Sequence, residues 1–234
     1  MRYLIMGDLH GGDLGPLETA MGQIAPDALI CLSDFDQAKT IRQFLALQER
    51  MGTKPVVSVA GNHDLAVLDG TYIYSGSMAR QGKSFWEFHD ELHADSIARD
   101  YLHLLVHEMP FRVPLDIGGR HALVMHAALD GSLVSYPACP SAERDLWLRL
   151  LCEEDYLQNF AAMRAEGVDI LIRGHDHAPK LASLNEKLRI EEPTAGSRYA
   201  LGEGMHVINP GAWCDKWFAT LDAGEVPVLH YRRL

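Results

Sequence analysis

The sequence lacks any hydrophobic run long enough to cross a membrane. Residues Met1 to Met6 form a short apolar run, and Gly7 and Asp8 end it. A spanning helix needs about 20 apolar residues, and the run is also too short for the core of a signal peptide. We therefore expect no membrane association and a cytoplasmic protein.

The sequence also lacks paired cysteines, internal repeats and low-complexity tracts. Its four cysteines, Cys31, Cys139, Cys152 and Cys214, form no C-x-x-C pair. A chain of 234 residues can bury a core without disulfides, so we expect reduced thiols. Cys31 lies in a buried-strand pattern and is expected to pack there. The length fits a single α/β domain over residues 1–234.

Positive charge is scarce in this chain. It has 21 Lys and Arg against 32 Asp and Glu, which gives a net charge of −11 with histidine neutral. An acidic surface repels phosphate backbones, so we expect no non-specific nucleic-acid binding. An enzyme of phosphate esters is not excluded, because bound metal ions would dominate the charge of their own site.

Strand and helix patterns alternate at the start of the chain. Apolar strand patterns at Tyr3 to Met6, Ala28 to Leu32 and Pro55 to Ala60 alternate with helical patterns at Leu14 to Ile24 and Ala38 to Met51. This β-α-β-α-β order predicts an α/β fold with helices on both sides of the sheet. In such sheets, ligands bind beyond the carboxyl ends of the strands.

The rest of the chain is less regular. Gly70 to Gly118 contains a helical stretch from Leu92 to Val106 and is interpreted as a cap beside the site. His121 to Met125 and Val168 to Ile172 predict buried strands, and Ala142 to Ala165 has a long helical pattern. A second, more antiparallel sheet is predicted from four short strand patterns: Lys180 to Leu184, Met205 to Asn209, Trp217 to Leu221 and Val226 to Tyr231.

Side chains that can bind metals follow five of the predicted strands. The clusters are Asp8-Leu9-His10, Asp34, Asn62-His63-Asp64, His126 and His175-Asp176-His177. Carboxylate, imidazole and amide groups are ligands for dications such as Mn, Zn, Fe or Mg. Each short motif alone occurs by chance. A need for solubility would explain Asp and Asn at the strand ends, but not histidine in four of the five clusters. The five clusters together therefore predict a metal site.

In their order, these clusters resemble the motifs of the calcineurin-like metallophosphoesterase superfamily. The shared pattern is D-x-H, an Asp after a strand, G-N-H-D, a lone His and G-H-x-H, from Asp8 to His177. The later segment I-N-P-G at 208–211 resembles one found in smaller bacterial members. The resemblance implies a four-layer α/β/β/α sandwich of two mixed sheets, with the metal site at the carboxyl ends of the strands.

The resemblance also implies two divalent metal ions and their ligands. The implied ligands are Asp8, His10 and His177 for one ion, Asn62, His126 and His175 for the other, and Asp34 as the bridge. Mn²⁺ is the first expectation, with Fe, Zn, Ni or Mg as alternatives, because affinity alone does not select the metal. A metal-bridging hydroxide would attack phosphorus. His63 would donate a proton or hydrogen bond to the leaving group, and Asp64 would orient His63.

The chain departs from the family pattern at the second motif. The usual G-D-x-x-D is replaced by S-D-F-D at 33–36, so Asp36 is an alternative to Asp34 as the bridge. Asp36 is otherwise expected behind the ligands or as the N-cap of the next helix. Gln37 and Ala38 stand where protein Ser/Thr phosphatases have an arginine, and Asn-His-Asp replaces their Asn-His-Glu. Both differences disfavour a eukaryotic-type protein phosphatase.

The expected activity is hydrolysis of a phosphate monoester or diester of a small or nucleotide-like molecule. The D-L-H-G start at Asp8 also suggests a diadenosine-tetraphosphate hydrolase or a small protein phosphatase. A non-catalytic scaffold of the same fold is a third alternative, although every ligand position is filled here. Four cations are candidates for binding the substrate phosphate: Arg80, Lys83, Arg173 and Lys180. For each of them, a solvated surface charge is the better explanation.

Overall fold

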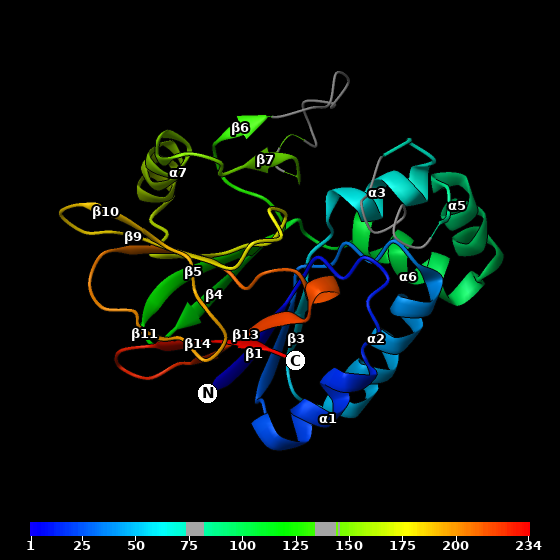
Figure 1. Ribbon diagram of the computed structural model, residues 1–234, viewed down its shortest axis with the longest axis horizontal. Helices are drawn as coiled ribbons and strands as arrows, with labels where there is room; N and C mark the ends of the chain where they lie inside the picture. Colours follow the sequence, from blue (N-terminus) through cyan, green and yellow to red (C-terminus); the bar gives the residue numbers. More distant parts are fainter. Residues whose placement is uncertain (74–81, 134–143, 145) are drawn as a thin grey trace.

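The computed structural model describes residues 1–73, 82–133, 144 and 146–234. Two six-stranded mixed sheets form its centre (Figure 1). The strands of the first sheet are β1 (Arg2–Met6), β2 (Ala28–Cys31), β3 (Val56–Ser58), β11 (Arg198–Ala200), β13 (Trp217–Asp222) and β14 (Val228–Arg233). They lie in the order β11-β14-β13-β1-β2-β3, with β1, β2 and β3 parallel and the other pairs antiparallel.

The second sheet is built around three parallel strands. Its members are β4 (Arg112–Ile117), β5 (Arg120–Met125), β8 (Ile170–Ile172), β9 (Lys180–Leu184), β10 (Leu188–Glu191) and β12 (Met205–Asn209). Their order is β10-β9-β12-β8-β5-β4; β5, β8 and β12 are parallel and the remaining pairs antiparallel. A separate two-stranded ladder joins β6 (Ser132–Leu133) to β7 (Leu148–Arg149).

Helices cover the outer face of each sheet. They are α1 (Gly15–Ile24), α2 (Ala38–Met51), α3 (Asn62–Asp69), α5 (Phe85–Ala94), α6 (Ser96–His107) and α7 (Glu153–Glu166), with a 3₁₀ turn at Trp213–Asp215. The first five lie on the side of the first sheet, and α7 lies on the side of the second (Figure 1). The predicted four-layer α/β/β/α sandwich is confirmed.

Three buried cores follow from the two-residue period of the strands. In β1, Leu4 and Met6 face the helices, whereas Tyr3 and Ile5 face the second sheet. In β5, Val124 lies between the sheets, while Leu123 and Met125 pack toward α7. Both faces of these strands are therefore buried, which explains why their sequences are apolar throughout rather than alternating.

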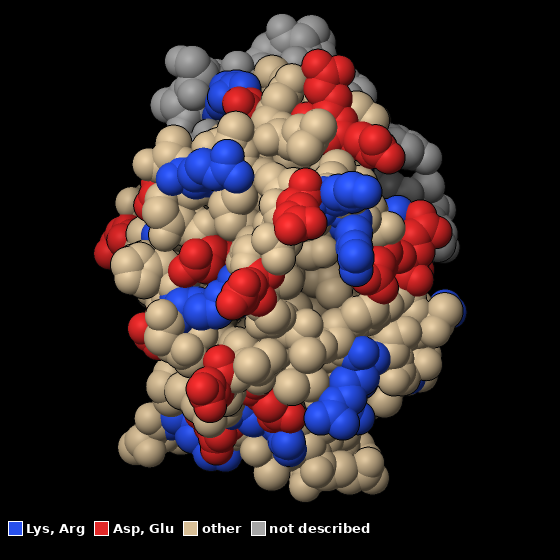
Figure 2. Space-filling model, turned by 90° about the vertical axis from the view of Figure 1, so that its left-hand side faces the viewer, with Lys and Arg blue, Asp and Glu red and all other residues tan. Residues whose placement is uncertain are grey.

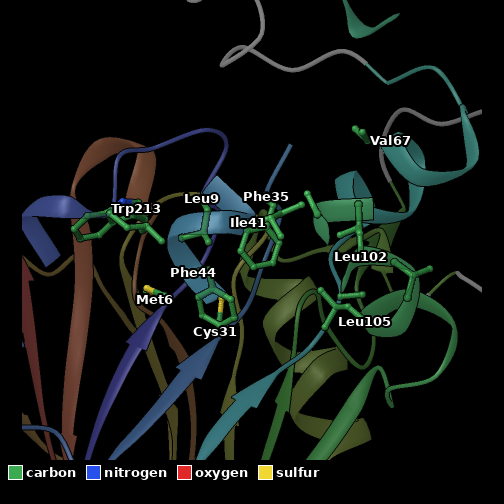
Figure 3. Close-up of a cluster of buried hydrophobic side chains, with 14 of the residues drawn as sticks. Met6, Leu9, Cys31, Phe35, Ile41, Phe44, Val67, Leu102, Leu105 and Trp213 are labelled. Atoms are coloured by element: carbon green, nitrogen blue, oxygen red, sulfur yellow. The ribbon is translucent and has the colours of Figure 1, made fainter. Parts of the chain in front are cut away.

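The helical core also anchors the loops that follow β1 and β2. Leu9 and Phe35 are fully buried among apolar side chains of α2 and α6 (Figure 3). The Phe35 ring packs against Phe44, with centroids 5.2 Å apart. Each of these two apolar residues lies between two polar residues, so its burial holds the neighbouring polar side chains at the edge of the sheets.

The described part of residues 70–118 contributes two helices and a strand to the fold. The helix expected at Leu92 to Val106 is two helices, because the Asp95 side chain accepts a hydrogen bond from the Ala98 N–H (3.1 Å) and begins α6. Both helices pack against α2 and α3 as part of the outer layer. The last part of the segment is β4, an edge strand of the second sheet. These elements thus belong to the layers of the sandwich, and a cap-like role of the segment beside the site stays a prediction.

Two further expectations are wrong. The helix predicted from Ala142 begins only at Glu153, because β7 precedes it and Asp155 accepts hydrogen bonds from the Leu151 and Cys152 N–H groups. Residues 142, 143 and 145 lie outside the described residues. The C-terminal strands do not form a sheet of their own: β9 and β12 join the second sheet, and β13 and β14 join the first.

Cys31 and Cys152 are free thiols, and Cys139 lies outside the described residues. Cys31 packs in the helical core, and burial raises the pKa of its thiol to about 12. Within the described part of the chain, every helix is too short or too polar to cross a bilayer.

Candidate metal centre

Three loops with unusual backbone geometry meet at the carboxyl ends of β1, β2 and β8. Among the described residues other than glycine, those loops contain most of the positive φ angles: Asp8, His10, Ser33, Asp34, Asp36, His175 and His177. Such a conformation costs free energy in a residue with a side chain. Direct contacts hold it in place: the His10 N–H donates to Asp34 O (2.7 Å), and the His175 N–H donates to the Asp8 carboxylate (2.9 Å).

Two glycines allow the ligand side chains to approach the backbone. A Cβ at Gly61 would lie 1.9 Å from Asp34 Oδ1 and 2.9 Å from His126 Cε1. A Cβ at Gly174 would lie 2.9 Å from Asp8 Oδ2. The glycines of G-N-H-D and G-H-D-H are therefore required for space.

The first ligand group consists of Asp8, His10 and His177. The Nε2 atoms of the two histidines are 2.9 Å apart, and His177 Nε2 is 3.8 Å from Asp8 Oδ1. His10 Nδ1 lies 2.7 Å from Asp36 Oδ2. A proton on Nδ1 is therefore shared with Asp36, which leaves the Nε2 lone pair directed at the centre of the group, the arrangement typical of a metal-binding histidine.

The second group consists of Asp34, His126 and His175. His126 Nδ1 donates to Leu32 O (2.6 Å), so its Nε2 lone pair faces Asp34 Oδ2 at 3.2 Å. Asn62 is the first residue of α3; its side chain is buried, and its Oδ1 has no hydrogen-bond partner.

Asp34 lies between the two groups. Its Oδ2 is 3.2 Å from His126 Nε2 and 3.7 Å from His10 Nε2. Its Oδ1 accepts a hydrogen bond from the His63 N–H (3.0 Å), which fixes the carboxylate. Asp36 instead lies behind His10, on its Nδ1 side. The geometry thus favours Asp34 over Asp36 as the residue that could join two ions.

The donor atoms fit metal ions. Asp34 Oδ2, Asn62 Oδ1 and His126 Nε2 are buried and form no hydrogen bond of normal geometry. A buried oxygen acceptor without a donor costs about 1–3 kcal/mol, and a cation beside Asp34 Oδ2 or Asn62 Oδ1 would take the place of the missing donor. Mixed nitrogen and oxygen donors suit borderline dications such as Mn, Fe, Zn or Ni.

The electrostatic field of the centre also favours cations. Burial lowers the pKa of His10, but the carboxylates of Asp36, Asp34 and Asp8 outweigh burial and raise the pKa to about 10. Burial likewise opposes protonation of His126, and Asp34 again outweighs it, raising the pKa to about 9. The same carboxylates would stabilise a dication that binds in place of the ring protons.

His63 lies at the edge of the centre and is held by Asp36. Its side chain is almost completely buried, and its Nδ1 is 2.9 Å from Asp36 Oδ1. The expected contact from Asp64 is wrong: the Asp64 carboxylate accepts hydrogen bonds from the N–H groups of Gly61, Asp34 and Phe35. Asp64 therefore ties the start of α3 to the loop after β2, while the carboxylate of Asp36 lies within 3 Å of one ring nitrogen of both His10 and His63.

Asp36 is also not the N-cap of α2. That position is occupied by Gln37, whose side chain makes no capping hydrogen bond. The sequence pattern could not assign the contacts of Asp36, because they depend on its positive φ of 59°.

The three candidate cations within the described residues do not gather at the centre. Lys83 pairs with Glu91, and Lys180 pairs with Glu192. Arg173 is fully buried; its Nε donates to Ala127 O (2.8 Å), and its Nη1 pairs with Asp176. Arg80 lies outside the described residues.

Sequence reasoning missed Arg149, because it falls in the segment expected to be helical. Its Nε lies 3.1 Å from Asp176 Oδ1, and its Nη2 lies 3.4 Å from His175 O. The side chain is 34% exposed. Arg149 is therefore a solvent-accessible cation in contact with the ligand loop after β8.

The I-N-P-G segment supports the same loop. The Asn209 side chain donates to Gly174 O (3.0 Å) and accepts from the Gly211 N–H (2.9 Å). The Ala212 N–H donates to His177 O (2.9 Å). The segment thus holds the G-H-D-H loop through backbone groups.

Comparison with protein families matches residues 1–226 to the calcineurin-like phosphoesterase superfamily domain. The match spans nearly the whole chain and agrees with the two flanked sheets and the Asp/His groups described above. The chain belongs to the calcineurin-like phosphoesterase superfamily, whose members bind a dimetal centre. A search of curated proteins finds no match.

Solved structures share the fold at low sequence identity. A metallophosphoesterase from Sphaerobacter thermophilus aligns with a TM-score of 0.69 and 20% identity, over 100% of this chain and 88% of that one. A hypothetical protein, PH1004, from Pyrococcus horikoshii OT3 aligns with a TM-score of 0.60 and 14% identity, over the same shares. At these identities, the likeness concerns the fold alone.

Proposed function

We propose that this chain is a metal-dependent hydrolase of phosphate monoesters or diesters, acting on a small or nucleotide-like substrate. The observation that carries the proposal is the buried group of Asp34, His126 and His175, in which Asp34 Oδ2 lies 3.2 Å from His126 Nε2 and neither atom has a hydrogen bond of normal geometry. His63 lies beside them as a group able to donate a proton. Family membership and the complete ligand set support catalysis over a scaffold role.

The residues would hold two ions in adjacent positions. Asp8, His10 and His177 would hold one, and Asn62, His126 and His175 the other, with Asp34 shared. When bound, the ions would offset the charge of the phosphoryl oxygens and lower the pKa of a water molecule. Mn²⁺ is the first metal to test, followed by Fe, Zn, Ni and Mg.

His63 would assist the leaving group. Asp36 contacts its Nδ1, so Nε2 is the nitrogen left to donate to the ester oxygen. The same carboxylate contacts His10 Nδ1, which couples the proton donor to the ligand group. A proton donor of this kind contributes about 10²–10⁴-fold to the rate.

The charged surface supports a small substrate rather than a nucleic-acid duplex. The side of the molecule that carries α7 and β10 shows acidic and basic side chains interspersed, without a continuous basic surface (Figure 2). Together with the net charge of −11, this distribution disfavours binding along a phosphate backbone.

The test is turnover of p-nitrophenyl phosphate and bis-p-nitrophenyl phosphate by protein purified without chelator. We expect Mn²⁺-dependent turnover that EDTA abolishes and added Mn²⁺ restores, and the ratio of the two rates distinguishes monoester from diester chemistry. Turnover that is unaffected by EDTA would contradict the proposal. So would the absence of turnover of either ester, and of a wider panel of phosphate esters, by protein with two bound ions.

A further inference from the structure

Helices α5 and α6 carry histidines that the metal centre does not use. The chain has 12 histidines, and five of them belong to the centre. Four others form two pairs at i, i+4 spacing: His89 and His93 on α5, and His103 and His107 on α6. Residues at this spacing lie on the same face of a helix, one turn apart, so each pair can offer two imidazoles to one ion.

The α6 pair is open to solvent and close enough to share an ion. The side chains of His103 and His107 are 59% and 42% exposed, and their ring centroids are 4.7 Å apart. Two nitrogens bound to one tetrahedral ion, with bonds of about 2.0–2.1 Å, lie about 3.3 Å from each other. As the side chains stand, the ligand atoms of His103, His107 and Asp69 do not all lie within 4.8 Å of one another, so binding requires rotation about the bonds of these exposed side chains.

Each histidine of the pair has a carboxylate beside it, and the one beside His107 comes from another helix. Asp69 Oδ1, at the end of α3, is 3.8 Å from His107 Nε2. On the other side, Glu108 Oε1 is 3.9 Å from His103 Nδ1. Two imidazoles with one or two carboxylates form a donor set that suits Zn²⁺, Ni²⁺ or Cu²⁺ better than Mg²⁺ or Ca²⁺.

The two helix ends strengthen the attraction for a cation. α3 ends at Asp69 and α6 ends at His107, and the two helices are in contact. The carbonyl end of a helix carries a partial negative charge, which favours cations within the last turn. We propose that His103, His107 and Asp69 form a third metal site, separate from the dimetal centre and specific for borderline transition-metal dications.

The α5 pair is a weaker candidate because its nitrogens are already engaged. His93 Nε2 lies 3.2 Å from Leu68 O, and His89 Nδ1 lies 3.2 Å from Asp90 Oδ1. The His89 ring also packs against Phe85 and Trp86 and is only 24% exposed. These contacts hold both rings away from a shared ion.

The proposed ion would link two helices, one of which begins in the metal centre. It would join the end of α6 to the end of α3, and the first two residues of α3, Asn62 and His63, lie in the metal centre. The site does not depend on the proposed function, because none of its ligands belongs to that centre.

The test is equilibrium dialysis of the untagged protein against Zn²⁺, with metal and protein measured in the retained fraction. The double variant His103→Ala/His107→Ala is expected to bind one Zn²⁺ per chain less than the wild type. Asp69→Asn is expected to weaken that ion by about tenfold or more, the loss typical of removing even an indirect partner of a metal ligand. This single surface change also serves if the double variant folds poorly.

Two control variants locate the effect. His121→Ala removes an exposed histidine of β5, and His89→Ala/His93→Ala removes the α5 pair; both are expected to bind as much Zn²⁺ as the wild type. Equal Zn²⁺ binding by the wild type and the α6 variant would overturn the proposal, as would loss of the ion in the α5 variant alone. The comparison counts a difference of one ion, so it remains valid whether or not the dimetal centre fills.

Discussion

The contact between Gly61 and Asp34 offers a sharp test of the metal centre. In Gly61→Ala, the new Cβ would lie 1.9 Å from Asp34 Oδ1. The backbone itself accepts alanine, because Gly61 has a φ of −100°. Any effect of the substitution therefore comes from displacing buried side chains of the centre, chiefly the Asp34 carboxylate and to a smaller extent the His126 ring, and not from strain in the loop.

The size of the displacement follows from the structure. Real Cβ contacts essentially never fall below 3.0 Å, so the two atoms must separate by a further 1.1 Å, the difference between 3.0 and 1.9 Å. Asp34 cannot retreat freely, because its Oδ1 accepts the His63 N–H and its Oδ2 faces His126. A misplacement of about 1 Å costs about 10²-fold in rate, and overpacking a buried site costs about 1–3 kcal/mol of stability.

The assay compares Gly61→Ala with Gly22→Ala, a change in α1 where an added Cβ meets no atom within 4 Å. Gly61→Ala is expected to lose bound Mn²⁺ and about 10²-fold in turnover. Gly22→Ala is expected to keep its bound Mn²⁺ and its turnover, and to gain about 0.5–1 kcal/mol in the free energy of unfolding. Wild-type metal content and turnover in folded Gly61→Ala would refute the reasoning.

Three further predictions concern the proton donor, its partner and a helix cap. His63→Ala should keep its metal content in elemental analysis and lose about 10²–10⁴-fold in turnover; loss of an ion would instead make His63 a ligand. Asp36→Asn should lose about 10–100-fold in metal affinity or turnover, because Asp36 contacts both His10 and His63; unchanged metal titration and turnover would contradict this role. Asp155→Ala should lose about 1 kcal/mol in urea unfolding at pH 7, because the side chain caps α7. Burial raises the pKa of Asp155, but hydrogen bonds, chiefly from Ser132, outweigh it and hold the pKa below 3.8. The contribution is therefore present above about pH 4 and lost as pH falls through the lower folded value; a difference from wild type that does not shrink at any pH below 4 would contradict the charge-based reasoning.

The strand-end clusters could be predicted because two local signals coincide. An apolar run indicates a strand buried on both faces, and the polar residues directly after it mark the edge of the sheet. Asp34 and His126 follow β2 and β5 in this way, and the structure brings both into one group. The family resemblance then implied how the groups pair, which spacing alone could not show.

Other features depend on contacts that no local pattern reveals. The helical period continues across Asp95, because Leu92 and Ala98 are buried in the same core, so the break between α5 and α6 was hidden. β4 contains Pro114 and buries only Ile117 completely, as an edge strand does, and its pattern was weak. The apolar residues of β13 show that the strand is buried, but not which sheet it joins.

The orientation of His63 illustrates the same limit. Asp64 is its neighbour in the chain and was the natural partner, yet the Asp64 carboxylate turns toward three backbone N–H groups. Asp36 reaches the ring instead, from a loop with positive φ that sequence patterns do not specify. The ligand types were predictable, whereas the residues that orient them were not.

The central claim is that Asp34 joins two metal positions in one centre. Asp34→Ala, dialysed against Mn²⁺ beside the wild type, tests it most directly, with bound metal measured per chain and the fold checked by circular dichroism. The account predicts that the folded variant holds two ions fewer than the wild type and loses phosphate-ester turnover with them. A folded variant that keeps both ions would contradict it and would transfer the bridge to Asp36.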